Sequence, residues 1–342
     1  MRIQPTRLLP IIPLAMCVAT SNAQLIETQY DAPSLDRWMY PFNGSPGTRF
    51  EMSVFGAPLL EGFDDHDAQV LLGFDTSTEF SPSLGADQYR VHDITVTVTV
   101  ANDNGFIYDD SYDDYTTYGV EGEPNDLDPG HPLNLFLPGY KPGISQSTFL
   151  ENSSFGTVPE VAPAQGMRNV FAAIFDNDGF AQNISNHVKE EFNAVPLAIG
   201  TTDLVNSGDL VPADTTFSFT FTPCDEGARD ELARMLDRGE IRFIVSAMSP
   251  ASGGPGGGEG DYPVFYSKEN PIAQIFGYAA TLDIRARVGS VGDYNGDGSK
   301  NFLDVSAFLA DFGNGDVAAD VNGDCSFNFL DVSGFLSEFS SN

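Results

Sequence analysis

The chain has 342 residues, of which 41% are apolar and 12% are aromatic. This length and composition predict a folded protein with one large domain or two smaller ones. The 49 acidic and 16 basic residues give a formal net charge of −33. Such a surface repels phosphate backbones and anionic headgroups, which argues against a nucleic-acid-binding or peripheral membrane protein. An acidic surface suits divalent cations or salty surroundings, and it also favours solubility.

Residues 1–23 are predicted to be a secretory signal peptide. Arg2 and Arg7 give it a positive start, an apolar stretch follows over residues 8–18, and small residues at 21–23 suit cleavage. The apolar stretch is too short for a good membrane span. We therefore expect a secreted or cell-envelope protein in a bacterial setting, with a mature chain that begins at Gln24.

A second interpretation of the N-terminus stays open. Residues 14–17 end in Cys17 and resemble a lipoprotein signal, in which this cysteine is lipidated instead of removed. Removal of the signal leaves two cysteines, Cys224 and Cys325, and export permits a disulfide between them without requiring one. The rest of the sequence has no apolar run long enough to predict a membrane anchor.

Residues 24–290 show the alternation of apolar and polar side chains that is typical of antiparallel strands. One face of such a strand lies in a core and the other faces water. The pattern therefore predicts a mainly β fold with an antiparallel β-sandwich-like region. The clearest runs are Ile94–Val100, Phe217–Phe221, Ile241–Ala247 and Leu282–Val288.

Helix signals are sparse in this region. Residues 225–238 begin with acidic side chains and end with Arg238 before Gly239, as the helix dipole favours, so we expect a helix there. A shorter helix is expected over residues 184–192.

The same region has neither an HExxH nor a GxSxG motif, so its catalytic residues are unknown and its status as an enzyme is uncertain. Residues 64–67 (DDHD) could hold a metal, but a solvated turn is the preferred interpretation. The acidic pairs at 109–110 and 113–114 could bind sugar or calcium, but an exposed acidic loop is preferred. Trp38 could stack on a sugar ring, but a core anchor is preferred.

An internal repeat occupies the C-terminal part of the chain. The segment DYNGDGSKNFLDVSAFLADF begins at Asp293, and DVNGDCSFNFLDVSGFLSEF begins 27 residues later at Asp320. Most aligned positions are identical and no gap is needed, which indicates a true duplication.

Each copy spaces its oxygen-bearing residues for calcium, which takes ligands from positions 1, 3, 5, 7, 9 and 12 of a loop of this kind. A duplicated pattern makes two calcium ions the predicted cofactors. The predicted ligands are Asp293, Asn295, Asp297, the Ser299 carbonyl, Asn301 and Asp304 in the first copy, and Asp320, Asn322, Asp324, the Ser326 carbonyl, Asn328 and Asp331 in the second.

Position 6 of such a loop makes a sharp turn and favours glycine. Gly298 fits this role in the first copy, whereas Cys325 does not in the second, so the second site is expected to be the weaker one. A helix is predicted after each loop, with one apolar stripe at i, i+3, i+7 and i+10. The two stripes are Phe302, Val305, Leu309 and Phe312, and Phe329, Val332, Leu336 and Phe339.

A duplicated half of an EF-hand with Asp at position 12 resembles a type I dockerin module. The resemblance covers residues 292–342 and implies that calcium orders two helices, which pack together and present a surface to a cohesin partner. Phe302-Leu303 and Phe329-Leu330 stand where cellulosomal dockerins usually carry small hydroxyl residues. This departure argues against a cellulosomal cohesin and leaves a different cohesin-like or envelope protein, or no partner, as the alternatives.

Residues 72–77 and the strand at Ile94 are similar to DNRLRE-type secreted β-sandwich modules, which implies a surface or carbohydrate-binding role. The predicted organisation is a signal peptide (1–23), a β-sandwich-like region (24–290) and a dockerin-like module (291–342). The leading hypothesis is an extracellular, non-enzymatic protein whose calcium-binding module attaches it to a partner. The alternative is a secreted polysaccharide-active enzyme that docks through the same tail.

Overall fold

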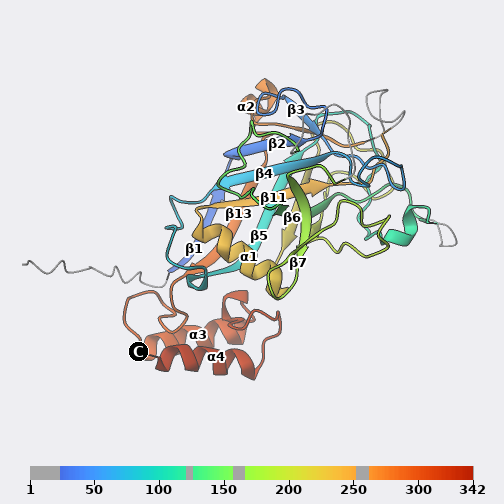
Figure 1. Cartoon of the computed structure of the whole chain (residues 1–342). Coiled ribbons are helices and arrows are strands. Elements are labelled where there is room, and N and C mark those ends of the chain that lie inside the picture. Colours follow the sequence, from blue (N-terminus) through green and yellow to red (C-terminus); the bar gives the residue numbers. More distant parts are fainter. Residues whose placement is uncertain (1–23, 121–125, 157–165, 252–261, 342) are drawn as a thin grey trace, which may run out of the picture.

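The structure is a computed structural model that describes residues 24–120, 126–156, 166–251 and 262–341 (Figure 1). The predicted signal peptide and Cys17 lie outside the described residues. Two β-sheets and helix α1 form a β-rich region, and two further helices form a small C-terminal part (Figure 1). The predicted mainly β fold with a small helical C-terminal part is therefore confirmed.

The smaller of the two large sheets has four antiparallel strands in the order β1-β13-β5-β10. Its strands are β1 (Gln24–Tyr30), β5 (Tyr89–Thr99), β10 (Thr216–Phe221) and β13 (Thr281–Val288). Three of the predicted strand runs lie here, at β5, β10 and β13.

The larger sheet has the strand order β2-β4-β11-β6-β7-β8, and β9 also pairs with β6. Its strands are β2 (Leu35–Met39), β4 (Gln69–Asp75), β6 (Asn134–Tyr140), β7 (Val170–Phe175), β8 (Ala181–Asn183), β9 (Ala198–Ile199) and β11 (Glu240–Ser246). The fourth predicted run is β11. A short pair, β3 (Glu51–Ser53) and β12 (Val264–Tyr266), completes the strands of the described residues.

One apolar cluster joins the two large sheets face to face. Val96 of β5 and Leu282 of β13 lie in it, as do Phe243 of β11 and Phe74 of β4. The threonines that alternate with these residues on β5 form hydrogen bonds across the outer face, for example Thr97 with Thr281. The period-two pattern thus separates core from surface, as it does in β-sandwiches.

A second apolar cluster covers the opposite face of the larger sheet, where Leu71 of β4 and Ile244 of β11 contact residues of the surrounding loops. These two strands are buried on both faces, which explains their nearly continuous apolar runs. Trp38 of β2 is 9% exposed and its indole N–H donates to the Ser53 carbonyl at 2.8 Å. Trp38 is therefore a core residue, which confirms the interpretation that was preferred to a sugar-stacking role.

Helix α1 (Glu226–Asp237) confirms the helix predicted at residues 225–238. The Asp225 carboxylate accepts the Ala228 N–H at 2.9 Å and caps the helix, while Leu232 and Leu236 enter the main core. The short helix predicted at residues 184–192 is wrong, because that segment consists of turns. A left-handed backbone at Glu191 (φ 54°) interrupts it.

The remaining helices are short or C-terminal. They are η1 (Ala86–Gln88), η2 (Tyr115–Tyr118), α2 (Pro271–Phe276), α3 (Phe302–Asn314), η3 (Val317–Ala319) and α4 (Phe329–Ser340). Strand β13 ends at Val288, so the boundary predicted near Gly289-Ser290 falls directly after the last strand. Residues 291–341, called the C-terminal module below, lie beside α1 and the end of the β-rich region (Figure 1).

Candidate metal centre

Two loops form the candidate metal centre. The first loop (Asp293–Asp304) leads into α3 and the second loop (Asp320–Asp331) leads into α4. Position 6 has a left-handed backbone in both, with φ 83° at Gly298 and φ 58° at Cys325. Glycine adopts this conformation freely, whereas another residue loses roughly 1–2 kcal/mol there. Both loops therefore contain the sharp turn of the calcium pattern, and Cys325 adopts it at a cost.

The aspartates at position 12, Asp304 and Asp331, are fully buried and hold each loop to its helix. One Asp304 oxygen accepts the Asn295 N–H at 3.0 Å and the other accepts the Asn301 N–H at 2.7 Å. Asp331 makes the equivalent pair of bonds in the second loop. A carboxylate has about four acceptor sites, so these bonds leave capacity for an ion.

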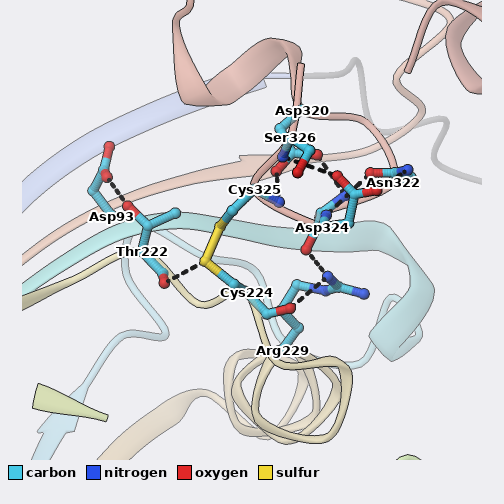
Figure 2. Close-up of a disulfide and its surroundings, with 10 residues drawn as sticks. Asp93, Thr222, Cys224, Arg229, Asp320, Asn322, Asp324, Cys325 and Ser326 are labelled. Atoms are coloured by element: carbon cyan, nitrogen blue, oxygen red, sulfur yellow. Dashed lines mark hydrogen bonds between the residues drawn. A yellow bond between two sulfur atoms is a disulfide. The ribbon is translucent and has the colours of Figure 1, made fainter. Parts of the chain in front are cut away.

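Positions 3, 5 and 7 follow the rim of each loop and are mostly exposed. The Asn295 oxygen accepts the Asp297 N–H at 3.0 Å, and an Asp297 oxygen accepts the Ser299 N–H at 2.9 Å. Figure 2 shows the equivalent residues of the second loop, Asn322, Asp324 and Ser326, gathered around Asp320. The sequence pattern therefore brings these predicted ligands into one turn in each copy.

The residues at position 9, which are predicted ligands, also have a structural role. Asn301 and Asn328 are the N-caps of α3 and α4, and their side-chain oxygens accept the N–H groups of Leu303 and Leu330 at 2.8 Å. These oxygens are directed at the helix backbone, so they would reach an ion through water, as position 9 often does. The side-chain amides donate to the position 7 carbonyls, for example Asn301 to Ser299 at 2.8 Å.

The two aspartates at position 1 differ in how their oxygens are bonded. Asp320 uses both oxygens, for the N–H groups of Gly323 and Cys325, at 2.8 and 2.7 Å. Asp293 uses Oδ2 for the Gly298 N–H at 3.0 Å, while its Oδ1 is buried without a hydrogen-bond partner among the residues that the structure describes. A buried carboxylate oxygen without a partner is costly. A cation bound in the first loop would supply positive charge at this oxygen.

Cys325 forms a disulfide with Cys224, which lies directly before α1 (Figure 2). Their Cα atoms are 5.5 Å apart, although 101 residues separate them in the sequence. The side chain that replaces the turn glycine thus links the second loop covalently to the β-rich region. This answers the open question about the two cysteines, and it gives Cys325 a structural reason to occupy position 6.

Four arginines of the β-rich region also contact the C-terminal module. Arg90 and Arg229 donate to carbonyls of the second loop, at Val321 and Gly323. The Arg285 guanidinium forms two bonds to Asp316, at 2.8 and 3.0 Å.

The fourth arginine, Arg287, donates to the Tyr294 carbonyl at 2.7 Å and lies over the Tyr294 ring, 4.1 Å from its centre. Burial lowers the pKa of Arg287, and the Tyr294 and Asp311 groups counteract this shift. Arginine combines planar stacking with several donors, which suits such an interface. These arginines could not be predicted from the sequence, because nothing in their spacing marks them as neighbours of the repeat.

The predicted apolar stripes of α3 and α4 are wrong in part. Phe308 and Phe335, which the stripes omit, form the buried centre of the module, with stacked rings 4.2 Å apart. The stripe residues Phe302 and Leu309 are instead 77% and 52% exposed, and Phe329 and Leu336 are similarly exposed. Each helix has more apolar residues than one buried face can hold, so the spacing alone does not select the inner face.

The solvated turn predicted at residues 64–67 is wrong, because all four side chains are buried. Asp64 pairs with Arg168 at 2.8 Å and Asp65 pairs with Lys189 at 2.6 Å. The cations that neutralise this segment lie more than a hundred residues away in the sequence.

His66, within the same segment, belongs to a buried polar chain. Its Nδ1 lies 2.7 Å from the Ser246 hydroxyl, and its Nε2 lies 3.0 Å from His187 Nδ1. Burial lowers the pKa of His187 to about 4, and burial also holds the pKa of His66 well below its ordinary value. The three side chains are 4% exposed or less, so this network joins β11 to the loops rather than facing a substrate.

The β-rich region has two further features of the kind that can form a site, which are a cavity and a group of carboxylates. A cavity of about 320 Å³ next to Cys224 is mainly apolar, and its charged lining residue, Asp225, caps α1. Asp36, Glu151 and Glu269 lie close enough to hold a metal, but the Lys268 ammonium lies among them, 3.1 Å from Asp36. Neither feature presents the paired groups of a catalytic centre.

Comparison with known proteins adds no family name: the sequence matches no family model and no curated protein. Within the residues that the structure describes, no helix is long and apolar enough to cross a membrane.

Proposed function

We propose that the chain is an exported, calcium-dependent attachment protein. In this proposal the C-terminal module binds two calcium ions and docks on a partner protein, and the β-rich region is what becomes attached. The surface or carbohydrate-binding role of residues 24–290 is part of the same proposal.

The observation that carries the proposal is the position of two exposed apolar pairs. Phe302-Leu303 and Phe329-Leu330 occupy the first turns of α3 and α4, directly between the loop ligands at positions 9 and 12. All four side chains are exposed by more than half. Exposed apolar side chains at such a density mark interaction surfaces. Calcium bound in the loops would fix the position of the first turns of α3 and α4, which carry these four side chains.

The internal symmetry of the module supports a docking role for both pairs. Phe308 and Phe335 are equivalent residues of the two repeats, and their stacked rings are nearly parallel, 6° apart. Contact between equivalent residues is what a two-fold axis produces. The two Phe–Leu pairs are therefore related by the same pseudo-symmetry and form two equivalent apolar patches.

The attachment of the module to the β-rich region supports the proposal further. The disulfide and the arginine contacts involve the loops, η3 and Tyr294, while the Phe–Leu pairs stay exposed. A partner bound at the pairs would hold the whole molecule in a fixed orientation. The partner chemistry that fits is a protein surface with apolar pockets for Phe and Leu side chains.

The test is calcium-dependent capture of partners from the extracellular fraction of the source cells. The variant replaces Phe302, Leu303, Phe329 and Leu330 by Ser, and the matched control replaces exposed Phe180 and Leu204 of the β-rich region by Ser. We expect the wild-type chain and the control to capture one protein with calcium and to release it with chelator. The proposal fails if the variant captures that protein equally well.

A further inference from the structure

We propose that four aspartates of the β-rich region form an additional calcium site, separate from the C-terminal loops. They are Asp109 and Asp113, from the segment after β5, and Asp126 and Asp128, from a segment before β6. One carboxylate oxygen from each lies within 4.8 Å of those of the other three. These residues are called the four-aspartate cluster below. The preferred interpretation of residues 109–114 as an exposed loop is wrong for Asp109 and Asp113, which are buried.

A buried carboxylate oxygen of Asp109 supports the binding of a cation at the cluster. Asp109 is 2% exposed, and its Oδ1 accepts the N–H and the hydroxyl of Ser111 at 2.8 and 2.7 Å. Its Oδ2 is buried and has no hydrogen-bond partner within the described part of the chain. An unpaired carboxylate oxygen in a buried site is costly unless a cation or a donor meets it. Three further carboxylates beside it make a cation the fitting partner.

The backbone is built to bring the two segments together. Gly130 has φ 106°, a conformation that favours glycine, and a Cβ atom there would lie 2.9 Å from the Ile107 carbonyl oxygen and 3.1 Å from the Asp109 Cβ. Glycine thus permits the segment around residue 130 to approach residues 107–109. The His131 ring orients Asp113, with Nδ1 3.2 Å from a carboxylate oxygen.

The ligand set favours calcium over other divalent ions. Calcium accepts six to eight oxygen ligands in variable geometry, whereas magnesium usually keeps its water and takes one or two carboxylates. Four carboxylates from two segments fit the first pattern. Asp113, Asp126 and His131 also lie within metal-binding distance of one another, and such a mixed set would suit zinc or manganese. The experiment must therefore separate these ions.

The experiment counts bound calcium on the full chain by equilibrium dialysis with elemental analysis. Asp113→Asn removes a buried ligand, and Asp128→Asn removes an exposed one whose loss leaves the core intact. The matched control is Asp110→Asn, an exposed neighbour outside the cluster. We expect each cluster variant to bind one calcium ion fewer than the wild-type chain, and the control to bind the same number. Near-ultraviolet circular dichroism establishes that each variant is folded.

The outcomes also separate this site from the proposed function. Loss of one ion in the Asp128→Asn variant supports the cluster, whether or not the C-terminal loops bind calcium themselves. An equal calcium count in the wild-type chain and in folded Asp113→Asn and Asp128→Asn variants would overturn the inference. Zinc binding that His131→Ala abolishes, without calcium binding at the cluster, would overturn the choice of calcium.

Discussion

Among the residues that the structure describes, the β-rich region buries 39 apolar residues in its main cluster, whereas the C-terminal module buries six in its own. The large region can be held together by its core, but a unit of about fifty residues rarely obtains enough stability from apolar burial alone. The module has additional links instead, which are a disulfide and arginine contacts, and we expect calcium in its two loops to add to them. Loss of one of these links should therefore affect the module before the β-rich region.

The largest effect is expected from the position 12 aspartates. The double variant Asp304→Ala, Asp331→Ala removes two buried carboxylates that join each loop to its helix. Calcium at a thousandfold excess over its Kd contributes about 4 kcal/mol per site, and that stabilisation should be lost together with the caps. We expect the α3 and α4 helix signal in far-ultraviolet circular dichroism to disappear. Retention of that signal would contradict the account.

The next largest effect concerns the disulfide. Closure of a loop of about 100 residues is worth about 4.7 kcal/mol in the chain-entropy model. Cys224→Ser with Cys325→Ser should lower the thermal midpoint of the module and leave that of the β-rich region nearly unchanged.

A second pair of substitutions, Cys224→Ser with Cys325→Gly, relieves the left-handed backbone at position 6 without restoring the covalent link. This variant should recover roughly 1 kcal/mol relative to the serine pair. If the glycine and serine pairs are equally stable, the turn at position 6 has no energetic role.

Acid is expected to destabilise the β-rich region. The pKa of buried His187 is lowered to about 4, so the unfolded chain binds a proton between about pH 6.5 and 4 that the folded chain does not. The contribution of His187 to the free energy of unfolding, about 3 kcal/mol, is therefore fully present above pH 6.5. It is lost as the pH falls towards 4. His187→Asn should have a shallower pH dependence of the free energy of unfolding. If the free energy of unfolding changed equally with pH in the wild-type chain and in the variant, this role of His187 would be refuted.

The smallest effect is expected at the interface. Arg285→Met removes two hydrogen bonds to Asp316 and should destabilise the module by about 1–2 kcal/mol. Glu27→Gln serves as the control, because Glu27 pairs with the same arginine but is itself exposed. Hydrogen exchange of η3 measures the difference, and equal exchange in both variants would show that Arg285 does not hold the module.

The sequence predicts the features that depend on local pattern. Alternation locates β5, β10, β11 and β13, and the acidic start with the Arg238-Gly239 end locates α1. The turn at Gly298 and the N-terminal ends of α3 and α4 also follow from the repeat, whereas the same turn at Cys325 was not expected.

Features that depend on distant neighbours are not predicted. Cys224 and Cys325 are 101 residues apart, and Asp64 is neutralised by Arg168. The face of α3 that is buried depends on Phe308 meeting Phe335, a contact between repeats that the spacing within one helix does not contain.

We expect calcium in the two loops to order the C-terminal module, and we expect the β-rich region to be stable by itself. Hydrogen exchange of the oxidised full chain, with calcium and with chelator, tests this directly. The amides of residues 293–341 are expected to lose protection in chelator, while those of β4 and β11 keep theirs. Equal protection of residues 293–341 under both conditions would contradict it.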